Sequence, residues 1–340
     1  MKKYLMVAAG ALAMASAFTV ETKAQDVDTI AILTPEEGTD YGWNQQGIDS
    51  AKAAADAAGV ELIVAQGLGY GDVRPTLREL SEEGADLMIA HASGYNTAAA
   101  EIAEETGVPV AIVDDPSATK EGLIGDYTLS GHEGAYLAGV LAAKQSRSKT
   151  VGIVVSGEPP AWNAQSAAFA QGVKATAPEA KVIYAVIGPA AYSDAAGGKR
   201  VTESVIAAGA DVIFGQGNGS SFGMLQAVET TKAADGGKVL FIDVIGDKTS
   251  IDKGYLLSSV VWDMTPVFEE MIADLKAGDY GTKNYSIGVA DGSVHLLKTP
   301  QVDDEAWEAV EAVKADIASG KVKVEPVWEA SEVRSLVSVQ

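Results

Sequence analysis

One stretch of the sequence decides the fold of this chain: Leu33-Thr34-Pro35-Glu36-Glu37-Gly38-Thr39-Asp40-Tyr41-Gly42-Trp43-Asn44-Gln45. The apolar run 29–33 before it predicts a buried strand, and the alanine-rich run 43–57 after it predicts a helix. A strand-to-helix turn of an open α/β sheet faces the ligand crevice. Because helix amides open toward solvent at such a turn, Trp43 is placed to stack on a flat ligand while Asn44 reads its edge. The alternative is that Trp43 packs on the core of its own lobe.

The first 24 residues have the pattern of a secretory signal peptide. Lys2 and Lys3 make a basic start, 5–18 is an apolar stretch too short to span a bilayer, and Thr22-Lys23-Ala24 offers a cleavage site. Cleavage after Ala17 is the alternative. The chain has no cysteine, which excludes disulfides, thiolate chemistry and a lipid anchor on an N-terminal cysteine. We therefore expect an exported, periplasmic protein that is not lipid-anchored.

Length and charge narrow the possible partners. Removing 24 of the 340 residues leaves about 316, which is enough for two domains. The net charge is -22 at pH 7, and it becomes about -24 because the removed segment carries three lysines and one glutamate. Such acidity argues against nucleic acid or an anionic membrane as a partner. A small-molecule ligand fits better.

After the signal segment the sequence alternates short apolar runs with helical runs. Nearly continuous apolar runs are typical of parallel strands that helices cover on both faces. The pattern occurs once before and once after a helix at 132–141, whose small residues permit close packing, so we expect two doubly wound lobes. The expected strands are 29–33, 61–65, 86–90, 108–113, 150–155, 180–186, 211–214 and 239–243, and the helices between them are 43–57, 73–83, 97–106, 162–176, 195–208 and 220–233.

The C-terminal part suggests that the chain passes between the lobes several times. Extended runs at 123–129 and 256–262 and the segment 298–301 are the expected crossings, which together make a hinge. The remaining expected elements are a helix at 266–277, strands at 286–290 and 295–298, and a helix at 304–318. On this basis lobe 1 comprises residues 25–126 and 257–299, and lobe 2 comprises 127–256 and 300–340.

Neither a nucleotide cofactor nor a metal is indicated. The glycine-rich segments 67–71 and 215–219 do not give G-x-G-x-x-G after the first strand of a lobe. His91, His132 and His295 are not at metal-binding spacing. We therefore expect a protein without a cofactor.

One motif points to catalysis. The segment 219–223 fits G-x-S-x-G through Ser221, and Asp243 and His295 follow in the order found in serine hydrolases. A nucleophile elbow turns sharply off a strand, whereas here a glycine-rich segment intervenes, so we interpret the motif as a crevice turn. We expect a binding protein and not an enzyme. The alternative is an exported hydrolase, using either this set or a nucleoside-cleaving set of Asp114, Asp115 and His91.

Aromatic and polar residues recur at the carboxyl ends of the expected strands in both lobes. Their joint placement describes a ligand that is held in a cleft between aromatic planes and carboxylates. The candidate ligand-binding residues are Trp43, Asn44, His91, Tyr95 and Asp114 in the first lobe, Trp162, Asn163, Asn218, Asp243 and Asp247 in the second, and Trp262 and Asp263 in an interlobe segment.

From residue 29 to residue 324 the chain resembles the basic membrane protein (BMP) family of ABC-transporter substrate-binding proteins, which includes purine-nucleoside receptors. The segments that carry the resemblance are Gly42-Trp43-Asn44-Gln45, Glu133-Gly134-Ala135-Tyr136-Leu137-Ala138-Gly139, Gly209-Ala210-Asp211-Val212-Ile213-Phe214 and Ser258-Ser259-Val260-Val261.

This resemblance implies a type I periplasmic-binding-protein fold, in which two Rossmann-like lobes joined by three crossovers close on a ligand and hand it to an inner-membrane ABC permease. It implies a monomer, a base stacked on Trp43, and acids that hold ribose at Asp114 and Asp247. The chain departs from the family pattern at Thr34, where an acid is usual, and at Trp262, where a lysine is usual. The expected ligand is therefore a purine, a nucleoside or a similar flat heterocycle, and the alternatives are a sugar receptor of the same fold and a sensory receptor.

Overall fold

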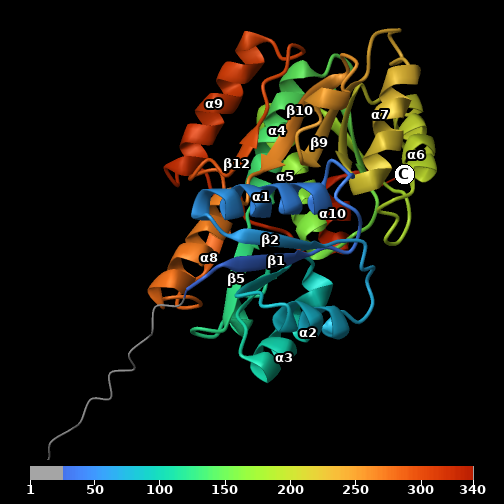
Figure 1. Ribbon diagram of the computed structural model, residues 1–340. Coiled ribbons are helices and arrows are strands. Elements are labelled where there is room, and N and C mark those ends of the chain that lie inside the picture. The colour runs from blue at the N-terminus through green and yellow to red at the C-terminus, as the bar shows by residue number, and fades with distance from the viewer. Residues whose placement is uncertain (1–25, 340) are drawn as a thin grey trace, which may run out of the picture.

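Strand β1 (Thr29–Leu33) and helix α1 (Trp43–Ala58) begin the first of two α/β lobes in the computed structural model, which describes residues 26–339 (Figure 1). The expected signal peptide, residues 1–24, lies outside the described residues. β1 is buried along almost its whole length, as its unbroken run of aliphatic residues predicts. α1 ends at Gly59, which has a φ of 67°, a left-handed conformation that glycine adopts without a steric penalty.

The first lobe is a parallel sheet with helices on both faces. Its strands lie in the order β11-β5-β4-β3-β1-β2, the order of a doubly wound fold. Helices α2 and α3 share one apolar core with the sheet, while α1 and α8 pack together on its other face. The further elements are β2 (Glu61–Ala65), α2 (Arg74–Glu82), β3 (Leu87–Ala90), η1 (Ser93–Tyr95), α3 (Asn96–Thr106), β4 (Val110–Val113), η2 (Pro116–Ala118), β5 (Ile124–Leu129), α8 (Thr265–Ala277) and β11 (Tyr285–Ile287).

The second lobe repeats this plan. Its strands lie in the order β12-β10-β9-β8-β6-β7-β13, all parallel to their neighbours except β12, which is antiparallel to β10. The elements are α4 (Gly131–Gln145), β6 (Thr150–Val155), α5 (Pro160–Thr176), β7 (Lys181–Val186), α6 (Ala195–Ala207), β8 (Val212–Gln216), η3 (Asn218–Ser220), α7 (Ser221–Thr230), β9 (Leu240–Ile245), η4 (Thr249–Ile251), β10 (Leu256–Trp262), β12 (Val294–Leu296), α9 (Asp304–Ala318), α10 (Ala330–Leu336) and β13 (Ser338–Val339).

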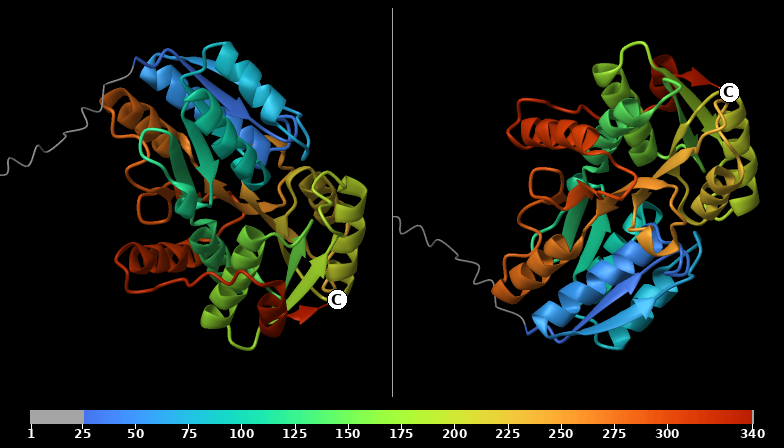
Figure 2. Two further views of the ribbon diagram at one scale, coloured as in Figure 1. Left: turned by 90° about the horizontal axis from the view of Figure 1, so that it is seen from below. Right: turned by 90° about the horizontal axis from the view of Figure 1, so that it is seen from above.

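The two sheets establish the expected fold class, but the crossings differ from those expected. β5 and β10 are not linkers, because each pairs along its length with a central strand of one sheet, β4 or β9. The chain changes lobes just after them, at 129–131 and 262–265, and again at 287–294 between β11 and β12. The expected crossing at 298–301 stays in the second lobe, and the expected lobe boundaries at 126 and 256 fall inside strands. In Figure 2 the orange helix α8 lies beside the blue helix α1, on the first lobe.

Helices α4 and α5 pack closely in the second lobe, as the small residues of α4 predict. A Cβ atom on Gly139 would lie 2.2 Å from the carbonyl oxygen of Phe169, and one on Gly172 would lie 2.2 Å from that of Tyr136. The two backbones therefore touch where each helix carries a glycine. None of the helices in the described part of the chain is long and apolar enough to cross a membrane.

Candidate functional site

A cavity of about 160 Å³ lies between the lobes, where the carboxyl ends of both sets of strands converge. Nearly every central strand contributes a lining residue from its end or from the turn after it, which is where doubly wound sheets bind ligands. The first lobe contributes Trp43, Tyr70, Ser93, Val113, Asp114 and Leu129, and the second contributes Pro159, Ala161, Trp162, Tyr192, Asn218, Ile245 and Trp262.

Five aromatic side chains dominate the lining, and several of them meet at steep angles. The rings of Trp43 and Trp262 have centroids 6.3 Å apart and planes at 82°, and those of Trp162 and Tyr192 are 5.3 Å apart at 88°. Tyr70 of the first lobe faces Tyr192 of the second at 6.0 Å. The rings therefore form walls that face in different directions.

Trp43 reaches this cavity because His91 holds its ring. The two rings are stacked 3.6 Å apart at 10°, and the indole Nε1 donates a hydrogen bond of 2.9 Å to the carbonyl oxygen of His91. His91 itself is fully buried, with Nδ1 2.7 Å from the hydroxyl of Tyr127 and Nε2 2.9 Å from the carbonyl oxygen of Trp43. Burial lowers the pKa of His91 to about 4, so its ring is neutral near pH 7.

The amides at the start of α1 are occupied by protein groups, which corrects the expectation that they open toward solvent. The Asp40 carboxylate accepts hydrogen bonds from the amides of Gly42 and Gln45, at 2.9 and 3.0 Å. The Trp43 amide lies 3.3 Å from Oδ1 of Asn218, across the cleft. Within this turn, the Trp43 side chain is therefore the part placed to meet a ligand.

Asp114 is the one carboxylate in the lining. It follows β4 with a φ of 54°, and its Oδ1 accepts a hydrogen bond of 2.9 Å from the amide of Leu129. The side chain is exposed to the cavity, but neighbouring protein atoms still remove part of the water around its carboxyl group. This desolvation raises the pKa of the carboxyl to about 6. Among residues 26–339 no lysine, arginine or histidine lines the cavity, so none of them gives Asp114 an opposite charge there.

Seven of the twelve candidate residues do not line the cavity, because other protein groups engage them. Asn44 donates to Asp40 inside the turn, and the buried Tyr95 donates its hydroxyl proton to the carbonyl of Gly69. Asp263 and Asp247 each accept a hydrogen bond from a nearby amide, and Asp247 is exposed. The seven are Asn44, His91, Tyr95, Asn163, Asp243, Asp247 and Asp263.

Asn163 and Asp243 have structural partners as well. Nδ2 of Asn163 donates to the carbonyls of Glu158 and Trp328, which ties α5 to the C-terminal segment. Asp243 is fully buried, and its Oδ2 lies 3.1 Å from Nζ of the equally buried Lys248. Polar residues at strand ends can thus satisfy one another and leave no group for a ligand.

The residues suggested for hydrolysis do not form a catalytic set. Ser221 donates its hydroxyl proton directly to Asp243, at 3.1 Å, so no histidine stands between them. His295 lies on β12 with Nδ1 3.1 Å from the carbonyl of Gly292. In the nucleoside-cleaving alternative, both ring nitrogens of His91 are engaged, at Tyr127 and Trp43.

Sequence reasoning missed Tyr70 and Tyr192, both of which line the cavity. Each follows a strand, β2 or β7, as the predicted site residues do. Tyr70 lies within the glycine-rich segment 67–71, whose glycines do not form a nucleotide-binding motif. An aromatic residue soon after each strand would have been the signal.

Several contacts join the lobes around the cavity. Nζ of Lys248 donates a hydrogen bond of 2.6 Å to the carbonyl of Tyr41, and Ser193 donates one of 2.8 Å to Glu36. The rings of Tyr41 and Phe222 meet edge to face at 6.0 Å. The two lobes are therefore closed on each other in this structure.

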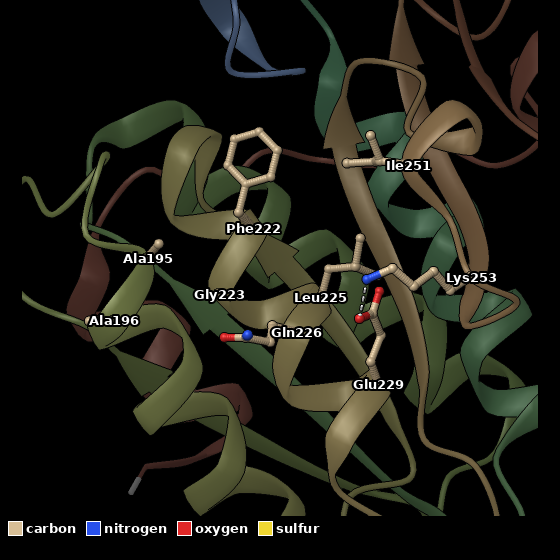
Figure 3. Close-up of a pocket in the computed structure, with 9 residues that line it drawn as sticks. All are labelled: Ala195, Ala196, Phe222, Gly223, Leu225, Gln226, Glu229, Ile251 and Lys253. Atoms are coloured by element: carbon tan, nitrogen blue, oxygen red, sulfur yellow. Dashed lines mark hydrogen bonds and ion pairs between the residues drawn. The ribbon is translucent and has the colours of Figure 1, made fainter.

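A larger cavity, of about 520 Å³, lies on the second lobe alone (Figure 3). It is an open groove between α6, α7 and η4, with Phe222 toward one end and the ion pair of Glu229 and Lys253 toward the other. This groove does not lie where the strand ends of the two sheets meet, so the interlobe cavity is the candidate site. No cluster of three or more metal-binding side chains occurs within residues 26–339.

Residues 27–326 match the Bmp family, described as PnrA-like substrate-binding proteins of ABC transporters. A nucleoside-binding protein of an ABC transporter from Lactococcus lactis is 23% identical over 315 residues, covering 86% of this chain and 88% of that protein. A purine-binding protein of Brucella abortus is 22% identical, covering 83% of this chain and 79% of that protein.

Solved structures agree on the fold. A solute-binding protein of an ABC transporter from Aeropyrum pernix superimposes with a TM-score of 0.78 at 18% identity, covering 91% of this chain and 96% of that one. Both the sequence relatives and this structure are named as binding proteins.

Proposed function

Because this chain belongs to the Bmp family of PnrA-like ABC transporter substrate-binding proteins, we propose that it is a periplasmic receptor that binds a flat heterocycle between its lobes and delivers it to an ABC permease. The observation that carries this proposal is the interlobe cavity, whose lining contains five aromatic rings at the carboxyl ends of strands from both lobes. Aromatic faces hold planar ligands by stacking. Among the predicted residues, Trp43, Asp114, Trp162, Asn218 and Trp262 are the proposed ligand contacts.

The size of the cavity favours a nucleobase over a nucleoside. About 160 Å³ is below the range of roughly 300–1,000 Å³ that is usual for ligand pockets. Asp247, one of the two acids expected to hold ribose, lies outside the lining.

A thermal-shift screen of nucleobases, nucleosides and pentoses tests the proposal. A ligand at about 100 times its dissociation constant adds roughly 2.7 kcal/mol to the stability of the folded state, so a true ligand raises the melting temperature clearly. We expect stabilisation by a free base and less by its nucleoside. Stabilisation by pentoses alone would instead identify a sugar receptor. Generic ester and nucleoside assays should show no turnover; more than one equivalent of product would identify an enzyme.

A further inference from the structure

The charged group in the cavity lining is negative. The lining combines five aromatic rings and the Asp114 carboxylate, and the described part of the chain contributes no lysine, arginine or histidine to it. Two further lining residues, Ser93 and Asn218, are polar but uncharged at any pH. The electrostatic character of the lining is therefore negative.

Carboxylates around the cavity reinforce this sign. Glu36 lies at the rim, where it accepts hydrogen bonds from Ser193 and Tyr70 at 2.8 and 3.4 Å. Asp126 is buried on β5, close enough for its charge to raise the pKa of Asp114. The buried cation at the lobe interface, Lys248, is already engaged by Asp243 and by the carbonyls of Tyr41 and Val244.

The arrangement of the rings points the same way. A neutral base needs only one or two parallel planes, whereas the rings here include two nearly perpendicular pairs, Trp43 with Trp262 and Trp162 with Tyr192. The five rings line one cavity from both lobes, and an aromatic π-face that meets a ligand there attracts a cation. A carboxylate beside such a group of rings adds a direct partner for the charge.

We propose that the ligand of this cleft is a small organic cation, a flat heteroaromatic ring with a positive charge, which pairs with Asp114 inside the aromatic lining. This inference rests on the proposed function, since it names the class of ligand for the same site. Asp114 makes one side-chain hydrogen bond within residues 26–339, to the Leu129 amide, so its other oxygen is available to the ligand.

Two pairs of probes that differ in charge but not in shape test this inference. The first pair is 1-methylnicotinamide and its neutral isostere 3-methylbenzamide, and the second is choline and 3,3-dimethylbutan-1-ol. Calorimetry should show that 1-methylnicotinamide binds at least about tenfold more tightly than its isostere, because both a cation–π and a charge-assisted contact are lost without the charge. The choline pair separates a requirement for charge alone from a requirement for a charged ring: choline binding as tightly as 1-methylnicotinamide would overturn the flat-ring part of the proposal.

Asp114→Asn assigns the charge selectivity to one residue. Asparagine tolerates the left-handed backbone at this position and can still accept the hydrogen bond from Leu129, so the variant should fold. We expect it to lose about tenfold or more in affinity for 1-methylnicotinamide and less than about twofold for 3-methylbenzamide. Asp115→Asn is the matched control, because Asp115 is the adjacent carboxylate and does not line the cavity. Equal losses for both probes would make Asp114 a structural residue and overturn the inference.

The outcomes separate this inference from the proposed function. Binding of neutral purines with no preference for either cation would leave the receptor intact and contradict the positive charge. Binding of no purine, other heterocycle or cation at all would contradict the proposed function itself.

Discussion

Trp43 stacks on the buried ring of His91 and also lines the cavity. Stacking on an aromatic side chain contributes roughly 1–3 kcal/mol, so Trp43→Ala should weaken ligand binding about 5- to 150-fold. Trp43→Phe should retain much of the affinity, because a smaller π-face remains. Calorimetric titration of the folded variants measures both effects.

The control for this prediction is Trp307→Ala. Trp307 lies on α9, where it is partly buried and has Nζ of Lys298 5.9 Å from its ring, so its loss should lower stability without lowering affinity. An affinity of Trp43→Ala within about twofold of the unmodified protein would show that the indole serves only to pack on His91.

His91 should make stability depend on pH. Burial holds its pKa at about 4 in the folded protein, whereas the usual value is about 6.5. Between these values the unfolded chain binds the proton and the folded chain does not, so this residue removes stability as the pH falls from about 6.5 to 4, by roughly 3 kcal/mol in all. His91→Gln, which cannot titrate, should lack this contribution.

The measurement is the difference in unfolding free energy between the two proteins at each pH. Asp114 acts in the opposite direction, because its raised pKa of about 6 makes the folded state take up a proton first, but it is present in both proteins and cancels. If the unfolding free energies of the two proteins change with pH in the same way between pH 6.5 and 4, then His91 takes up its proton in the folded state over the same range as in the unfolded chain.

At this scale the sequence predicted aromatic residues better than charged ones. Trp43, Trp162 and Trp262 line the cavity as expected, and Asp114 and Asn218 do so too. Asp243 does not, because a carboxylate at a strand end can pair with a lysine such as Lys248, and the pairing depends on contacts that the sequence does not display. Whether the lining residues bind a ligand stays a prediction.

At the scale of elements, the contact between α4 and α5 depends on two glycines. A Cβ atom at Gly139 or Gly172 would lie 2.2 Å from a carbonyl of the facing helix, so alanine at either position should force the helices apart. We expect each substitution to cost about 1–3 kcal/mol, and the double variant to cost less than the sum because the first change already separates the helices.

Denaturant unfolding measures these costs. Gly94→Ala is the control, because a Cβ atom there would meet nothing within 4 Å. Additive losses in the double variant would mean that the two glycines act at independent contacts.

The sequence predicted most elements because each strand and helix has its own hydrophobic period. It predicted the wrong role for β5 and β10, since an extended run looks the same whether it links lobes or pairs in a sheet; the pairing of β10 with β9 is a long-range contact. The short α10 and β13 at the C-terminal end were not predicted, and β13 exists only because it pairs with β7.

At the scale of the whole molecule, closure depends on the close approach of Gly246 to the first lobe. A Cβ atom there would lie 2.3 Å from the carbonyl oxygen of Tyr41. Gly246→Ala should therefore favour the open form, in which this clash is absent, and weaken binding because only the closed form satisfies contacts from both lobes. Small-angle scattering with saturating ligand should give a larger radius of gyration than that of the unmodified protein.

Gly188→Ala is the matched control, because the nearest atom to its Cβ would be 3.8 Å away, at Ala191. An unchanged scattering profile and affinity for Gly246→Ala would show that the lobes need not approach this closely to hold the ligand.

The hydrogen bond from Lys248 to the Tyr41 carbonyl joins the lobes through residues that do not line the cavity. The side chains that hold the two lobes together are thus different from those proposed to select the ligand. For protein engineering this separation is useful: the rings and Asp114 can be exchanged to accept a new analyte while the contacts that drive closure stay in place. A fluorophore pair placed on the two lobes would then report the new analyte with the same change of signal, which makes this scaffold a starting point for a family of biosensors.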